Sequence, residues 1–323
     1  MNLDSMSTAA LALIREDVRE TPLEESAVLS ERAGCRVSLK LENFQVTGSF
    51  KIRGVLAKLR ALPADELARG VITASTGNHG LACAHAAGLI GFDVEIVLPE
   101  GAPEWRREAL RRAGAGVVLR GGECEEAEVW ARAEAGRRGL VYVPPYNDAD
   151  VVAGQGTIGI ELSRQADRVD LVCASVGGGG LLAGVAGALK GRHGEARALG
   201  CLPSNSPAMH DSIAAGRIVR SEVLPTLSDA TAGNIEEGAI TFDLCRRHVD
   251  DWVLVSEDEI RSAMELVLRG HDMMIEGAAG VAVAGFLKHI PKCGLNRDSH
   301  AVIIVCGGNV SPAELAGFVL PTE

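Results

Sequence analysis

The chain has 323 residues, of which 47% are apolar and 3% aromatic, with 38 glycines and a net charge of −11. This length supports one or two domains with a large core, and a composition rich in glycine and alanine is typical of α/β proteins with close helix–sheet packing. The negative charge argues against nucleic acid as a partner, and no apolar run is long enough to span a membrane.

The cysteines indicate a reduced environment. All eight lie outside any CxxC motif or Cys/His metal spacing, and several fall in apolar runs, where cysteine acts as a small hydrophobic residue. The N-terminal segment around Asp4 lacks the basic and apolar pattern of a secretion signal. We therefore expect a cytoplasmic protein that does not associate with a membrane.

Two series of strands and helices are predicted, with a break at 144–148, Pro-Pro-Tyr-Asn-Asp. The first series has helices at 11–18, 50–59, 77–89, 104–112 and 125–136, and strands at 37–41, 70–74, 94–98, 116–119 and 140–143. The second has helices at 154–164, 181–190, 257–268 and 278–287, and strands at 171–176, 198–202 and 301–305. Strands that alternate with helices predict βαβ units and a parallel sheet. The four arginines of 105–112 are expected on a solvated helix face.

Lys51 lies at the start of a predicted helix, after the turn residues Thr47, Gly48 and Ser49, which are candidate caps. A lysine is unfavourable there because the helix dipole is positive at that end. Between Phe50 and Ile52 its amine would be partly desolvated, and desolvation lowers a lysine's pKa and favours Schiff-base chemistry. A surface lysine with its stem on apolar neighbours is the alternative.

Four consecutive glycines, Gly177 to Gly180, follow a predicted strand and precede a helix. Glycines let several backbone N–H groups converge on an anion, and the helix N-terminus adds positive potential, so a phosphate site is predicted. No GK[ST] follows, which excludes a nucleotide P-loop. The following strand ends at Cys201-Leu202 without an acidic residue for a ribose, which weakens a dinucleotide site; a tight turn is the simplest alternative.

The segment Ser75-Thr76-Gly77-Asn78-His79 occupies another strand-to-helix junction. Ser75 and Thr76 could simply cap the helix. The free N–H groups of the same junction could instead bind a carboxylate.

Together with Cys306-Gly307-Gly308-Asn309, these segments resemble, in order and spacing, the motifs of the serine/threonine dehydratase family of fold-type-II pyridoxal-phosphate enzymes. The resemblance covers nearly the whole chain. It implies an α/β fold like that of the tryptophan synthase β subunit, with two open, twisted, mostly parallel sheets, flanking helices and the cofactor between domains. The implied large domain comprises 1–69 and 147–323, the small domain 70–146, and the assembly a homodimer.

The resemblance also assigns roles. Lys51 would carry the cofactor, pyridoxal 5′-phosphate, and move the catalytic proton. The cofactor phosphate would rest on the loop and the start of its helix, and the ring would meet residues from four segments: Gly177, Gly178, Gly179, Gly180 and Leu181 for the phosphate; Phe50, Asn78, Glu276 and Cys306 for the ring. The substrate carboxylate would bind Ser75, Thr76, Gly77, Asn78 and His79, with His79 more structural than acid/base. From the residues alone, Cys306 could equally be an ordinary buried cysteine and Glu276 a helix cap.

Three departures from the family pattern bear on function. Asp229-Ala230 stands where the family usually has Asp-Gly, so a methyl group would meet the ring. Thr76 occupies the position of an acid/base serine in racemase-like members, so Thr76 is a candidate catalytic residue. Both acidic ligands of metal-dependent members are missing around 202–208, so no metal is predicted.

The predicted reaction is β-elimination from a β-hydroxy-α-amino acid, giving a 2-oxo acid and ammonia. A neutral thiol at the ring nitrogen suits elimination, because the electrons leave with the β-substituent. An amino-acid racemase, a β-replacement transferase, a dinucleotide-dependent oxidoreductase and a non-catalytic binding module are the alternatives. Segment 234–242 resembles a subgroup that includes dehydratases of hydroxyectoine breakdown and of phenylserine, and the acids at 124–126 favour a neutral or amine-bearing substrate side chain.

Overall fold

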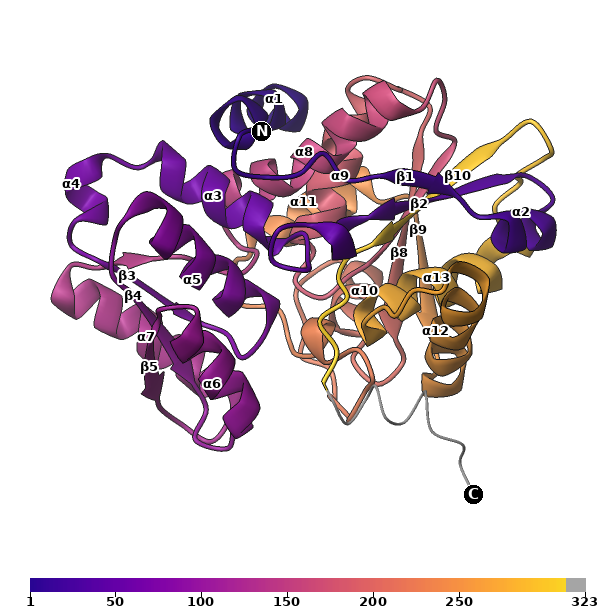
Figure 1. The fold of residues 1–323 in the computed structure, drawn as a ribbon. Coiled ribbons are helices and arrows are strands. Elements are labelled where there is room, and N and C mark those ends of the chain that lie inside the picture. The colour runs from indigo at the N-terminus through magenta and orange to yellow at the C-terminus, as the bar shows by residue number, and fades with distance from the viewer. Residues whose placement is uncertain (312–323) are drawn as a thin grey trace.

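The computed structural model describes residues 1–311 and contains two sheets, each flanked by helices (Figure 1). The six-stranded sheet has the order β1 (Leu23–Glu25), β2 (Arg36–Leu41), β10 (His300–Val305), β7 (Leu171–Ser175), β8 (Arg197–Pro203) and β9 (Asp251–Val255). All its neighbouring strands are parallel except β1 and β2. The four-stranded sheet is wholly parallel, in the order β5 (Gly116–Leu119), β4 (Val94–Leu98), β3 (Val71–Ala74) and β6 (Val141–Tyr142). The predicted two-sheet α/β architecture is confirmed.

Most of the helices connect one strand to the next, and the first helix precedes the first strand at the N-terminus. The α-helices are α1 (Leu3–Ile14), α2 (Ala27–Ala33), α3 (Lys51–Ala61), α4 (Ala64–Leu67), α5 (Asn78–Ile90), α6 (Glu104–Arg112), α7 (Cys124–Arg138), α8 (Ala149–Gln165), α9 (Gly180–Lys190), α10 (Ala208–Ala215), α11 (Ile240–His248), α12 (Glu257–His271) and α13 (Gly277–His289). The 3₁₀ helices are η1 (Glu42–Phe44), η2 (Asp229–Thr231) and η3 (Ile290–Lys292).

Two predicted helix starts were wrong because an upstream cap was overlooked. The helix predicted at 11–18 is α1, which begins at Leu3 after Asn2 accepts a hydrogen bond from the Ser5 N–H. The helix predicted from Gly154 begins at Ala149, because the Asp148 carboxylate accepts hydrogen bonds from two N–H groups of the first turn. At the start of α12, Ser256 and Glu259 form a capping box.

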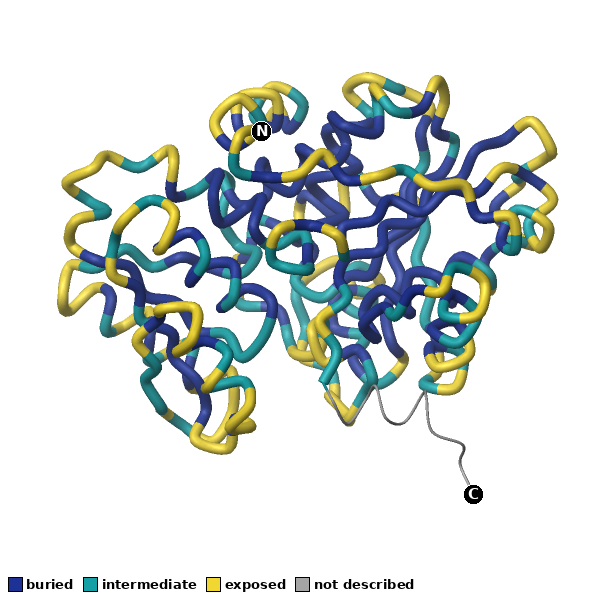
Figure 2. The backbone as a smooth tube through the Cα atoms, in the orientation of Figure 1, coloured by how far each residue is buried: buried dark blue, intermediate teal, exposed yellow. Residues whose placement is uncertain are grey.

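Glycine packing explains the composition of the central helices. A side chain at Gly184 of α9 would collide with the Val152 carbonyl oxygen of α8, and one at Gly154 of α8 would collide with Gly54 of α3. These helices therefore approach backbone to backbone. The central strands β7 and β10 are buried along their whole length (Figure 2).

The loops that matter for function follow the carboxyl ends of β2, β3, β7 and β10. In open parallel sheets this is the edge where ligands bind, at the point where crossovers diverge. A fully buried ion network fixes the loop that follows β2. Arg53 of α3 donates to both oxygens of Glu42 at 2.8 Å and to both oxygens of Glu161 at 2.6 and 2.9 Å. Lys40 of β2 donates to the same Glu161 at 2.5 Å. The network ties the start of α3, two residues after Lys51, to the large sheet and to α8.

Candidate active site

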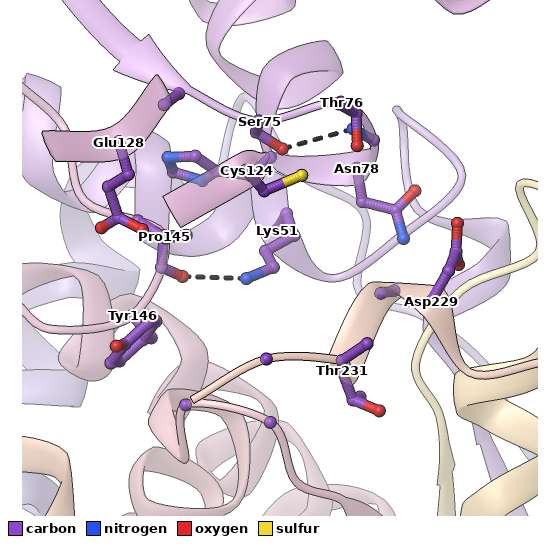
Figure 3. A pocket seen from close by; sticks show the side chains of 18 of the residues that line it. Lys51, Ser75, Thr76, Asn78, Cys124, Glu128, Pro145, Tyr146, Asp229 and Thr231 are labelled. Atoms are coloured by element: carbon purple, nitrogen blue, oxygen red, sulfur yellow. Dashed lines mark hydrogen bonds between the residues drawn. The ribbon is translucent and has the colours of Figure 1, made fainter. Parts of the chain in front are cut away.

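A cavity of about 1080 Å³ lies where the carboxyl edges of the two sheets face each other. It is lined by residues of every segment singled out in the sequence: Phe50, Lys51, Ser75, Thr76, Gly77, Asn78, His79, Gly177, Gly178, Gly179, Gly180, Leu181, Glu276 and Cys306. Figure 3 shows Lys51 near its centre, with Ser75, Thr76 and Asn78 on one side and Tyr146 on another. The structure thus brings all the predicted site residues into one cavity.

Lys51 is the first residue of α3, and its Nζ donates to the Pro145 carbonyl oxygen at 2.8 Å (Figure 3). Burial lowers the pKa of Lys51 to about 8, although Cys306 and Glu276 partly oppose this shift. The predicted caps were wrong: the N-cap is Phe50, and no side chain caps α3. Instead, the Phe50 N–H donates to the Cys306 carbonyl oxygen at 3.0 Å, which holds Lys51 beside the end of β10.

The loop after β3 leaves backbone donors free at the start of α5. The N-cap is Gly77, which has no side chain, so the simple reading of Ser75 and Thr76 as caps was wrong. Ser75 accepts from the Gly77 N–H at 3.3 Å, whereas the N–H groups of Asn78 and His79 donate to no acceptor among the described residues. Such N–H groups at a helix N-terminus suit a carboxylate.

The His79 ring is buried, and its Nε2 donates to the Val143 carbonyl oxygen at 3.0 Å, because a carbonyl can only accept. Burial and the nearby Lys51 lower the pKa of His79 to about 3, so the ring is neutral. A neutral imidazole already bonded to the backbone supports a structural role for this side chain.

The tetraglycine loop forms a cradle without side chains between β7 and α9. A Cβ on Gly178 would overlap the Tyr146 ring, and Gly179 has φ +87°, a conformation that side chains disfavour. The N–H groups from Gly178 to Leu181 have no acceptor among the described residues. The predicted loop therefore has the donors, the room and the helix terminus that a phosphate group requires.

Glu276, Asn78 and Cys306 form a buried cluster beyond Lys51. The Asn78 amide donates to the two Glu276 oxygens at 3.1 and 2.9 Å, and Cys306 Sγ lies 3.6 Å from both Glu276 Oε1 and Ser175 Oγ. Burial raises the pKa of Glu276 to about 7 and that of Cys306 well above its usual range. Glu276 is the N-cap residue of α13, as the residues alone allowed, but its side chain makes no capping bond and accepts from Asn78 instead.

The prediction for residues 105–112 was wrong in part. Trp105 and Arg106 line the cavity, and Arg106 pairs with Asp229 and donates to Thr76 Oγ1 at 3.3 Å. Helical periodicity identifies the helix, but which face docks on the other sheet depends on tertiary packing.

Sequence reasoning also missed Tyr146, Glu128, Thr231 and Asn309, all of which line the cavity. Asn309 Nδ2 donates to Asn78 Oδ1 at 2.8 Å, and its place after Gly307-Gly308 was the available signal. For Tyr146 the signal was the Pro144-Pro145 break. Glu128 and Thr231 lie in stretches that carry no distinctive pattern.

A buried lysine with a lowered pKa and two strand-to-helix loops with free N–H groups, all in one cavity between two mostly parallel sheets, are the features of a fold-type-II pyridoxal-phosphate enzyme. The chain belongs to the family described as pyridoxal-phosphate dependent enzyme, whose model matches residues 14–307. The predicted fold class, family and cofactor are confirmed.

Three relatives illustrate the similarity. The chain is 40% identical over 297 residues to the L-threonine ammonia-lyase of Thermotoga maritima, covering 92% of this chain and 73% of the relative. Processed threonine deaminase isoform 2 of Solanum lycopersicum superposes with a TM-score of 0.92 at 33% identity, covering 98% of this chain and 87% of that one. Serine racemase of Dictyostelium discoideum gives a TM-score of 0.88 at 30% identity, covering 96% and 99%.

Proposed function

We propose that the chain is a pyridoxal-phosphate-dependent ammonia-lyase that dehydrates and deaminates a β-hydroxy-α-amino acid, with threonine as the first substrate to test. The observation that carries this proposal is the Lys51 amine, buried in the same cavity as the tetraglycine cradle and with a pKa of about 8. Relatives named threonine ammonia-lyase and serine ammonia-lyase support β-elimination.

The residues that would hold the cofactor follow from the geometry. Backbone N–H groups of Gly178 to Leu181 would bind its phosphate, Phe50 would pack on its ring, and the Cys306 thiol would face the ring nitrogen. The bound cofactor supplies an electron-withdrawing ring that acidifies the Cα–H bond of the attached amino acid. Because the pKa of Cys306 is raised, the thiol stays neutral and cannot fix a proton on that nitrogen, which favours elimination over a persistent carbanion.

The protein's own groups would bind the substrate and move the proton. The loop from Ser75 to His79 would bind the α-carboxylate through its free N–H groups and so fix the orientation of Cα. Lys51, released from the cofactor by the substrate amine, would remove the α-proton. Its lowered pKa keeps a useful fraction of the amine neutral near pH 7 to 8.

A racemase is the second candidate because Thr76 carries a hydroxyl at the cavity wall, where Arg106 donates to it at 3.3 Å. The serine racemase and aspartate racemase neighbours fit this reading secondarily. A chiral assay of recovered threonine or serine during turnover would reveal it. No specific observation favours a β-replacement transferase.

Lys51→Ala tests the proposal directly. The variant should retain its fold but lose at least about 10³-fold in turnover, because it removes both the cofactor anchor and the base. The measurement is 2-oxo acid and ammonia release from threonine, together with borohydride reduction and mass spectrometry of the Lys51 peptide. Lys58→Ala on the same helix is the control. An active Lys51→Ala variant, or a reduced cofactor on another lysine, would refute the assignment.

We propose a homodimer in the cytoplasm, with domains at 1–69 plus 147–323 and at 70–146. Eight free cysteines support a reducing compartment. None of the helices in the described residues has the length and apolarity needed to cross a membrane. Light scattering of the purified protein tests the dimer.

A further inference from the structure

The cavity wall formed by α7 carries charges that the proposed chemistry does not use. In Figure 3 the Glu128 carboxylate lies on one side of Lys51, and the side chains of Thr76 and Asn78 lie on the other. If the α-carboxylate binds the loop of Thr76 and Asn78, the substrate side chain extends toward α7. Glu128 is therefore placed to contact that side chain.

Two carboxylates share one guanidinium at this wall. Arg132 Nη2 donates to Glu128 Oε1 at 3.3 Å and to Glu236 Oε2 at 2.7 Å, and its guanidinium lies 4.6 Å from the Tyr142 ring centroid. Tyr142 also donates to Glu128 Oε1, at 3.1 Å. With both acids ionised, the trio carries one net negative charge.

In both Glu128 and Glu236, one carboxylate oxygen accepts no hydrogen bond from the described residues. Glu236 Oε1 is buried and has no partner among the described residues, and no described residue donates to Glu128 Oε2. Burial, reinforced by Glu236, raises the pKa of Glu128, the response expected of a carboxylate that lacks compensation. A cationic donor arriving at this wall would meet free acceptors and relieve the repulsion.

The other two arginines of the cavity lining, Arg106 and Arg220, are paired with other acids. Arg106 pairs with Asp229, and Arg220 makes a bidentate pair with Glu125 at 2.9 Å. The sequence had placed the relevant acids at 124–126, but Glu125 is neutralised by Arg220 and Glu126 accepts from the Gly122 N–H at 2.6 Å. The uncompensated charge comes from Glu128 and Glu236 instead.

We propose that Glu128, with Glu236, forms a side-chain subsite that selects β-hydroxy-α-amino acids whose side chain bears an ammonium group. This inference rests on the proposed lyase function and specifies its substrate class. A side-chain carboxylate would be rejected at the same wall, because it would add a third negative group beside one guanidinium.

The test compares substrates that differ only beyond Cβ, using the holoenzyme. Threonine, 3-hydroxy-2,4-diaminobutyrate, which adds an amine to the threonine skeleton, and 3-hydroxyaspartate are assayed for 2-oxo acid release. We expect kcat/KM for the diamino acid to exceed that for threonine by at least ~10-fold, as for a charge-assisted hydrogen bond, and 3-hydroxyaspartate to be the poorest substrate.

Glu128→Gln is the decisive variant, and its readout is the ratio of kcat/KM for the diamino acid to that for threonine. The ratio should fall ~10-fold or more, whereas a merely structural role would lower both values and leave the ratio unchanged. Glu236→Gln should lower the ratio in the same direction. Glu134→Gln, on the same helix and paired with Arg137 at 2.6 Å, is the control and should change neither value.

The outcomes separate the two proposals. Turnover of threonine without a preference for the diamino acid, or a preference that survives Glu128→Gln, overturns the subsite and leaves the lyase function intact. Absence of 2-oxo acid from all three substrates refutes the lyase function, and the subsite with it.

Discussion

Burying the Glu276 carboxyl reduces the stability of the folded protein, and we attribute this cost to the function of the site. It accepts two hydrogen bonds from Asn78 and lies near Cys306, yet burial still raises its pKa to about 7. Its charge also raises the pKa of Lys51 and so opposes the burial that makes this amine reactive. Such clusters of perturbed groups are typical of active sites, which sacrifice stability for chemistry.

We predict that Glu276→Gln stabilises the apoprotein in a pH-dependent way. The pKa of Glu276 is about 7 in the folded protein and 4.5 ordinarily, so the native state binds the extra proton, and wild-type stability falls as pH rises from 4.5 to 7. Gln removes this penalty, so the variant should gain up to about 3 kcal/mol at pH 8 and nothing at about pH 4.

Thermal melts of both apoproteins across this pH range give the comparison, with Glu108→Gln on the exposed face of α6 as control. That control should shift stability by less than about 0.5 kcal/mol at any pH. A Glu276→Gln variant that is less stable than wild type at pH 8 would mean that the carboxylate is stabilising.

At the scale of single residues, the local pattern singled out Lys51 and the glycines but not the side chains that surround them in the cavity. A lysine against the helix dipole and four glycines after a strand each violate a local preference, and such violations often mark function. Nothing local distinguishes Glu128 from the neighbouring acids Glu125 and Glu126. Only the docking of α7 on the cavity decides which of them is neutralised and which belongs to the proposed subsite.

At the scale of elements, the loop between β7 and α9 has no side chains, and its proposed role in binding phosphate depends on this. We predict that Gly178→Ala lowers cofactor affinity at least ~10-fold, because the added methyl would overlap the Tyr146 ring and displace the N–H groups of the cradle. The control is Gly136→Ala in α7, where a methyl meets open space and should be neutral or stabilising. Cofactor titration of both apoproteins, followed by absorbance, makes the comparison; equal affinities would show that the cradle tolerates a side chain.

Helices and strands were predicted correctly where the local sequence pattern matches the burial of the residues in the fold. Strands 94–98 and 116–119 and helix 104–112 were predicted with the bounds that the structure has. β9 was missed although residues 252–255 form an apolar run; the strand lies at the sheet edge and is only partly buried. α11 was missed because it follows a long irregular stretch and packs on α9, a contact set by tertiary structure.

At the scale of the whole molecule, three ion pairs connect the helices of the small sheet to loops of the large one. Arg106 pairs with Asp229, Arg132 with Glu236 at 2.7 Å and Arg220 with Glu125 at 2.9 Å, and all six residues line the cavity. Sequence could not reveal them, because each joins segments 95 or more positions apart. Since the pairs bridge the cavity, we infer that they favour the arrangement in which the two sheets enclose the substrate.

The exposure of the paired side chains limits how much free energy such an ion pair can contribute. Arg220 and Glu125 have 72% and 58% of their side chains exposed, so their pair should contribute well under about 1 kcal/mol. Reversing one charge converts attraction into repulsion, so Arg220→Glu should raise KM for threonine about three- to fivefold and leave kcat nearly unchanged. Glu125→Arg should do the same.

The double variant Arg220→Glu/Glu125→Arg restores an opposite-charge pair across the cavity and should return KM to within about twofold of wild type. Arg246→Glu, which breaks an exposed pair within α11, is the control and should leave KM unchanged. In about 1 M salt, screening should reduce the difference between single and double variants, because the Debye length falls to about 3 Å. Additive effects of the two reversals would instead mean that each residue acts alone, and that closure of the cavity depends on apolar packing rather than on these charges.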